Sequence, residues 1–128
     1  MKIDTSQINE KELIKFGFQV TEYIKEHKYK EIEKHFGYAL AFSESPANVI
    51  ENEIEKCLSQ AGNAAKLSMK SDPNILVKFF EENDTNLIAV VECYLVIENG
   101  VGELLVELIV AGTEIEAQLS LEEISYED

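Results

Sequence analysis

Across residues 87–121 apolar and polar side chains alternate around two turn signals, a pattern typical of three antiparallel strands. Asn99-Gly100 favours a type I′ turn, because both residues tolerate a positive φ, and Gly112-Thr113 suits a type II′ turn, which needs glycine first. Two-residue loops at both turns predict one wholly apolar face, which we assign to the core. The predicted pairs on this face are Leu95 with Leu104, Cys93 with Val106, Val91 with Leu108, Ala89 with Val110, Leu104 with Leu121, Val106 with Leu119, Leu108 with Ala117, and Val110 with Ile115.

The opposite face of these strands mixes carboxylates with apolar side chains. In the predicted registers Glu92 lies opposite Glu107, and Glu103 lies opposite Glu122. Like charges directly opposite one another destabilise a sheet, so a sheet selected for stability alone would alternate the signs. We interpret this face as a partner-binding surface with an apolar centre and an anionic rim; the alternative is a solvated face whose charge limits aggregation. Its predicted residues are Glu92, Tyr94 beside Leu105, Glu103, Glu107, Ile109 between Val90 and Glu116, and Glu122.

Three helices are predicted before these strands. Asn9 and Glu12 have the spacing of a capping box, and apolar residues then recur at helical intervals. Ser45 is expected to cap a later helix in which Pro46 takes the first position, where the missing N–H costs nothing. Gly62 ends that helix. The predicted helices span residues 10–27, 29–42 and 46–61.

A further strand is expected between the helices and the meander. Residues 75–82 alternate loosely, and the loop that follows has two or three members; residues 64–74 are assigned to a loop. We prefer three loop residues, which place Ile75, Val77 and Phe79 on the core face and Lys78 opposite Glu92. The chain is thus predicted to form one α+β domain, residues 1–128, with three N-terminal helices on one face of a bent four-stranded antiparallel meander. This order resembles the cystatin-like and nuclear-transport-factor-like cones, a resemblance of architecture that carries no function by itself.

The charge is concentrated in the predicted sheet. The 128 residues have a net charge of −14 and no arginine; residues 1–78 contain all 11 lysines and 12 acidic residues, whereas residues 79–128 contain 13 acidic residues and no lysine. Direct binding to nucleic acid is not expected, because that affinity depends on cations. A basic protein is the expected partner. With no apolar run of signal-peptide or membrane-span length, a cytoplasmic location is expected, and Cys57 and Cys93 are interpreted as reduced core thiols.

Catalytic and metal-binding motifs are not found in the sequence. His27, Glu31 and His35 would share one face of a continuous helix, but the predicted helix break near residues 28–29 separates them, so neither a metal nor a cofactor is expected. Because the predicted core face offers no polar group for proton transfer, a non-enzymatic protein is favoured. The alternative is a small-molecule-binding, isomerase or hydrolase-type protein with a pocket inside the cone, for which Tyr23, Tyr38 and His35 are the candidate donors.

The C-terminal third resembles a known kind of protein. The segment from Gly102 to Leu108, with the stretch from Ala117 to Asp128, is similar to the closing strands of small acidic immunity proteins from bacterial contact-dependent growth inhibition and related toxin systems. This resemblance implies a cytoplasmic inhibitor that masks a toxin, often a basic nuclease. It implies no role for any particular residue, because immunity families vary greatly.

Overall fold

The computed structural model describes residues 1–42, 44–113 and 115–128. Its helices are α1 (Glu10–Lys25), α2 (Tyr29–His35) and α3 (Pro46–Ala61), with 3₁₀ turns η1 (Thr5–Gln7) and η2 (Ala39–Ala41). Its strands are β1 (Lys2–Ile3), β2 (Lys66–Leu67), β3 (Asn74–Phe79), β4 (Leu87–Glu98), β5 (Glu103–Gly112) and β6 (Ala117–Glu127). The predicted α+β class is confirmed, but the antiparallel sheet has six strands, because the short β1 and β2 were not expected. β2 lies within the predicted loop of residues 64–74.

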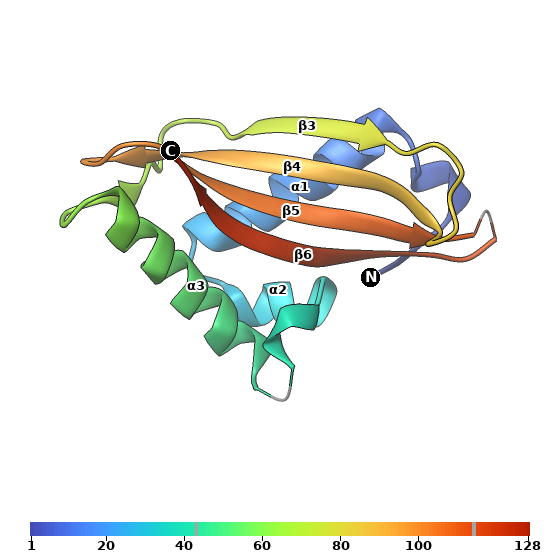
Figure 1. Ribbon diagram of the computed structural model, residues 1–128, viewed down its shortest axis with the longest axis horizontal. Helices are drawn as coiled ribbons and strands as arrows, with labels where there is room; N and C mark the ends of the chain where they lie inside the picture. Colours follow the sequence, from blue (N-terminus) through green and yellow to red (C-terminus); the bar gives the residue numbers. More distant parts are fainter. Residues whose placement is uncertain (43, 114) are drawn as a thin grey trace.

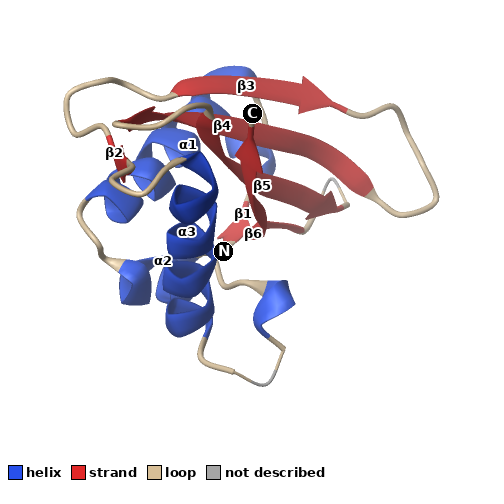
Figure 2. Ribbon diagram, turned by 60° about the vertical axis from the view of Figure 1, so that its left-hand side comes forward, coloured by secondary structure: helices blue, strands red, loops and turns tan. Residues whose placement is uncertain are grey.

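The helices cover one face of this open sheet, and we call it the inner face (Figure 1). α1 packs against β3 and β4, α3 packs against β5 and β6, and α2 contacts both other helices. β1 extends the sheet beside β6, while β2 and β3 follow one another along the far border of β4 (Figure 2). Among the described residues no helix covers the opposite, outer face. The outer face consists of Asn74, Leu76 and Lys78 of β3, Val90, Glu92, Tyr94 and Val96 of β4, Glu103, Leu105, Glu107 and Ile109 of β5, and Ser120, Glu123, Ser125 and Glu127 of β6.

The hairpin of β4 and β5 has the predicted register but a different turn. All the pairs predicted between these two strands are present. The positive φ angles fall on Asn99 (59°) and Gly102 (84°), so the turn is not the predicted type I′. Gly100 is needed for another reason, since a Cβ there would lie 2.9 Å from the Ala61 carbonyl oxygen. The end of α3 therefore shapes this turn, and the Val101 N–H donates to the same carbonyl.

The predicted register of β5 and β6 is wrong by four residues. Leu108 pairs with Leu121 rather than with Ala117. β5 ends at Gly112 and β6 begins only at Ala117, so the connection is longer than the two residues predicted. The Thr113 hydroxyl accepts hydrogen bonds from the backbone N–H groups of Ile115 and Glu116 at 3.3 and 3.2 Å. Side chains alternate with a period of two, so an even shift keeps Ala117, Leu119 and Leu121 on their predicted face. The predicted pair of Val110 with Ile115 is wrong: Val110 pairs with Leu119, and Ile115 lies before the strand and is 93% exposed.

A β-bulge then changes the pairing within β6. Leu121 pairs with Leu108 and Glu123 pairs with Glu107, so Glu122 is the additional residue. An additional residue in one strand reverses the alternation beyond it. Ile124 consequently faces the core, where it is 5% exposed.

β3 also pairs differently from the prediction. Its odd-numbered residues face inward as expected, but Phe79 at the end of the strand is 51% exposed. Lys78 lies opposite Val90 rather than opposite Glu92, because the strand ends earlier and the connecting loop is longer than three residues. The ammonium group still reaches Glu92 diagonally.

Two predicted helices end earlier than expected. α1 ends at Lys25 rather than at residue 27, because His27 adopts a positive φ of 58°. α2 ends at His35 rather than at residue 42, and Gly37 turns the chain with a φ of 68°. The predicted break between these helices is therefore confirmed.

The N-terminal caps are partly as predicted. Asn9 accepts a hydrogen bond from the Glu12 N–H at 2.9 Å, which confirms it as the cap of α1. Ser45 occupies the cap position of α3, but its hydroxyl donates to Glu33 of α2 at 3.1 Å. The same Glu33 oxygen accepts the Ala47 N–H at 3.0 Å. A carboxylate from the preceding helix thus caps α3, which attaches α2 to α3.

The core lies between the helices and the inner face. Ile24, Ile32 and Ile50 of the three helices are buried against the strands. Cys57 and Cys93 are buried free thiols, as predicted, and burial raises the pKa of Cys93 to about 12. In the described part of the chain no helix has the length and apolarity that crossing a membrane would require. The inner-face strand residues in this core are Ala89, Val91, Cys93, Leu95, Leu104, Val106, Leu108, Val110, Ala117, Leu119, Leu121 and Ile124.

Candidate functional site

Three carboxylates from three neighbouring strands form a row across the outer face. Glu107 on β5 lies opposite Glu92 on β4 and opposite Glu123 on β6. Residues that are directly opposite hold their Cβ atoms about 4.5–5.5 Å apart, so these negative charges act on one another. Burial, followed by the charges of Glu123 and Glu92, raises the pKa of Glu107 above its ordinary value of 4.5. We call these three residues the acidic row.

One lysine reaches the acidic row. Lys78 Nζ lies 2.9 Å from Glu92 Oε1, a buried oxygen that has no other polar partner among the described residues. This contact raises the pKa of Lys78. Within the same residues neither Glu107 nor Glu123 forms an ion pair. The uncompensated negative charge therefore lies toward β5 and β6.

Apolar side chains lie on both sides of the acidic row. On one side Tyr94 pairs with Leu105, and on the other Val90 pairs with Ile109. Leu105 is only 4% exposed and Val90 only 9%, although no helix covers them, while Tyr94 and Ile109 are half-buried. The outer face is thus an apolar surface crossed by a line of carboxylates.

Two of the eight predicted binding residues lie outside this arrangement. Glu116 belongs to the loop before β6 and forms an ion pair with Lys2 at 3.1 Å. Glu122 is the exposed additional residue of the bulge, and Glu127 takes the predicted place opposite Glu103. The error at Glu116 follows from the two-residue loop that was predicted at residues 112–113, whereas the error at Glu122 follows from the bulge. The residues that the fold does bring together are Glu92, Tyr94, Glu103, Leu105, Glu107 and Ile109.

Sequence reasoning missed two acidic residues of the outer face, Glu123 and Glu127. The signal that could have revealed them is the pair of consecutive acids between Leu121 and Ile124, which breaks the alternation. Two polar residues between two buried ones indicate a bulge in an antiparallel strand. With a bulge at that point, Glu123 is expected on the same face as Glu107.

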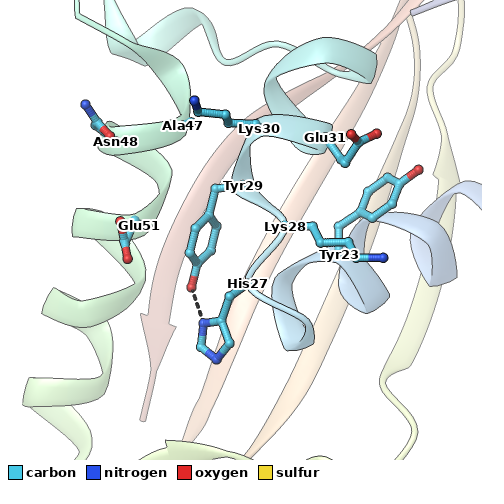
Figure 3. A pocket seen from close by; sticks show the side chains of 9 residues that line it. All are labelled: Tyr23, His27, Lys28, Tyr29, Lys30, Glu31, Ala47, Asn48 and Glu51. Atoms are coloured by element: carbon cyan, nitrogen blue, oxygen red, sulfur yellow. Dashed lines mark hydrogen bonds between the residues drawn. The ribbon is translucent and has the colours of Figure 1, made fainter.

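A separate groove lies among the helices (Figure 3). His27 Nδ1 and the Tyr29 hydroxyl are hydrogen-bonded at 2.9 Å, and burial together with Glu51 and Glu55 raises the pKa of Tyr29. The groove contains no residue of β3–β6, and its side chains carry charges of both signs. Its volume is about 820 Å³, and its lining residues are Tyr23, His27, Lys28, Tyr29, Lys30, Glu31, Ala47, Asn48 and Glu51.

The residues considered for metal binding or proton transfer do not form a common site. His27 follows α1, whereas Glu31 and His35 pair with each other on α2 at 3.4 Å. Among the described residues no three histidine, cysteine or acidic side chains are close enough to hold a metal ion. The Tyr23 ring stacks on His35 with their centroids 5.9 Å apart. Tyr38 lies outside the groove, and its burial, together with Glu53, raises its pKa to about 12.

The interior of the domain offers little for chemistry. Apart from the phenol of Tyr38 and the two thiols, the polar side chains among the described buried residues are Thr21, Lys25 and Ser68. The Thr21 hydroxyl donates to the carbonyl groups of α1, and the Lys25 ammonium donates to the Ser71 carbonyl at 2.7 Å. Both side chains are thus hydrogen-bonded to backbone carbonyl groups and stabilise the fold. The outer face is therefore the best candidate for the functional site.

Comparison with protein-family models, with curated proteins and with solved structures finds no match for this chain.

Proposed function

We propose that this protein is a non-enzymatic inhibitor that binds a basic protein through its outer face. The observation that carries the proposal is the acidic row of Glu92, Glu107 and Glu123, which crosses an apolar surface left uncovered by the helices. Binding of a cationic partner would relieve the repulsion within this row. Apolar surface around it would supply contact area and exclude water from the ion pairs that form.

The partner that we propose is a toxin domain, which the inhibitor neutralises inside the cell that makes it. Support for this part comes from the resemblance of the C-terminal strands to small acidic immunity proteins. The concentration of charge agrees with it, because residues 79–128 contain 13 acidic residues and no lysine. A surface of this charge accelerates encounter with a basic domain. The captured partner should accordingly be a basic protein that is toxic when it is produced alone.

The test uses three versions of this protein as bait to capture basic proteins from the source cell. The first is the wild type, and the second carries Tyr94→Ala and Glu107→Lys, which alter the apolar centre and the acidic row. The third carries Glu22→Lys, a matched change of charge at an exposed position of α1. We expect the wild type and the Glu22→Lys variant to hold the same partner and to restore growth when the partner is produced, whereas the double variant does neither.

Rate measurements on the single variants separate charge from apolar contact. Replacing Glu107 with Lys should slow association by about tenfold or more at low salt and by much less at high salt, because steering by charge is screened. Tyr94→Ala should instead accelerate dissociation by about thirtyfold, the effect of a typical interface hot spot. The proposal would be overturned if the wild type, the Tyr94→Ala and Glu107→Lys double variant and the Glu22→Lys variant all held the captured partner equally well.

A further inference from the structure

β3 forms the open border of the sheet. It pairs with β4 alone, and no other strand of the described residues lies along its far side (Figures 1 and 2). The Phe80 N–H donates to the Ile88 carbonyl at 2.9 Å. In an antiparallel pair every second residue of a strand bonds to its partner strand, so this hydrogen bond shows which residues of β3 bond to β4. Even-numbered residues therefore bond to β4, and the backbone groups of Ile75, Val77 and Phe79 point outward. These outward groups are free to bond to another strand.

This border lacks most of the features that prevent strands from pairing with other proteins. Leu76 is 43% exposed, Phe79 is 51% exposed and Phe80 is 45% exposed. Natural border strands usually carry charges or proline along their length. The single charge within β3 is Lys78, and its ammonium is turned onto the sheet by Glu92.

The charges around β3 favour one kind of occupant. Asp72 precedes the strand, Glu81 and Glu82 follow it, and the acidic row begins on the next strand. A second copy of this chain would bring its own net charge of −14 against these acids and would be repelled. An extended segment rich in lysine or arginine would be attracted.

We propose that β3 takes up an extended basic segment of the partner as an additional strand of the sheet. This inference rests on the proposed function and adds the mode of recognition. Backbone hydrogen bonds to Val77 and Phe79 would supply affinity, as in other cases of strand addition. Apolar side chains of the segment would lie beside Leu76 and Phe80, and the rest of the partner would cover the outer face.

The first experiment uses a defined probe, a capped eight-residue peptide of alternating lysine and valine. Its controls are the same peptide N-methylated throughout, which keeps the charge but cannot donate backbone hydrogen bonds, and a peptide with glutamate in place of lysine. We expect the lysine peptide to bind the wild type at least about ten times more tightly than either control. We also expect the amide hydrogens of Val77 and Phe79 to exchange at least about ten times more slowly when it is bound.

Two variants of one residue extend this test. Val77→Pro removes an outward N–H without removing a hydrogen bond to β4, and Val77→Ala makes a similar change in packing while keeping the N–H. We expect Val77→Pro to weaken peptide binding at least about tenfold and Val77→Ala to change it less than about threefold. Circular dichroism checks that both variants are folded; the exchange measurement on the wild type needs neither of them.

Several results would overturn strand addition: no binding of the lysine peptide, equal binding of its N-methylated form, or unchanged exchange at Val77 and Phe79. A dimer of the protein without peptide, broken by Val77→Pro, would assign the border to a second copy instead. The cellular partner separates this inference from the proposed function. If that partner is lost with Tyr94→Ala and Glu107→Lys but retained by Val77→Pro, the function stands and the strand-addition mode is wrong.

Discussion

Replacing Glu107 with glutamine removes the central charge of the acidic row while keeping the shape of the side chain. Glu107 lies opposite Glu92 and Glu123, and its pKa is raised by burial and by these neighbours. A raised pKa means that the folded protein holds this proton more firmly than the unfolded chain does. The contribution of Glu107 to stability must therefore fall as the pH rises from the ordinary value of 4.5 through the raised pKa, and this loss persists at neutral pH.

The size of the effect follows from the pairing of the strands. A pair of like charges directly across a sheet costs about 0.2–1 kcal/mol. Glu107 has two such neighbours, but Lys78 compensates Glu92 at 2.9 Å, so Glu123 provides most of the repulsion. The carboxylates of Glu107 and Glu123 are partly solvated, which reduces their repulsion further. We expect Glu107→Gln to raise the free energy of unfolding by about 0.5 kcal/mol at pH 7 and low salt.

Urea unfolding at several pH values and salt concentrations measures this difference. The gain should disappear below about pH 4, where both the wild type and the variant are neutral at residue 107, and it should shrink in about 1 M salt because of screening. The control is the same substitution combined with Lys78→Gln. Without the lysine Glu92 is no longer compensated, so the gain from Glu107→Gln should be larger in that background.

Three results would refute this reasoning. A loss of stability at pH 7 would show that the Glu107 carboxylate has a favourable partner. A gain that persists at pH 3.5 would show that charge is not its cause. Equal gains with and without Lys78 would mean that Glu92 and Glu107 do not interact, and the acidic row would lose its physical basis.

Two further predictions concern the fold. Leu108→Ala should cost about 2–5 kcal/mol because Leu108 is fully buried on the inner face, whereas Ile109→Ala on the outer face should cost about 1 kcal/mol; equal losses in urea would contradict the assignment of faces. Glu33→Ala should lower the stability by about 1 kcal/mol through loss of the α3 cap, and Glu33→Gln should retain much of it; amide exchange at Ala47 should accelerate only in the alanine variant.

Much of the fold could be predicted because the relevant interactions are local. The cap at Asn9, Pro46 at the start of α3 and the alternation of β4 with β5 all act between near neighbours in the chain. The turn residues around Asn99 keep the predicted register even though the turn type differs, because the apolar pairing on the inner face favours it. The confirmed α+β class follows from the order of these elements.

The register of β5 with β6 could not be predicted in the same way. A displacement by four residues leaves each side chain on the same face, so alternation contains no information about it. The loop is instead stabilised by the hydroxyl of Thr113. The bulge at Glu122 did leave a trace in the sequence, because two acids interrupt the alternation before Ile124.

By itself the sequence determined the fold class, the faces of most strand residues and the opposition of Glu92 to Glu107. Only the tertiary structure decided which charges complete the acidic row and which are compensated, because Glu123, Lys78 and Glu116 are placed by loops and by diagonal contacts. Short-range patterns specify which side of a strand a residue faces. Its neighbours across the sheet depend on loop length, bulges and the packing of helices, which act between residues far apart in the chain.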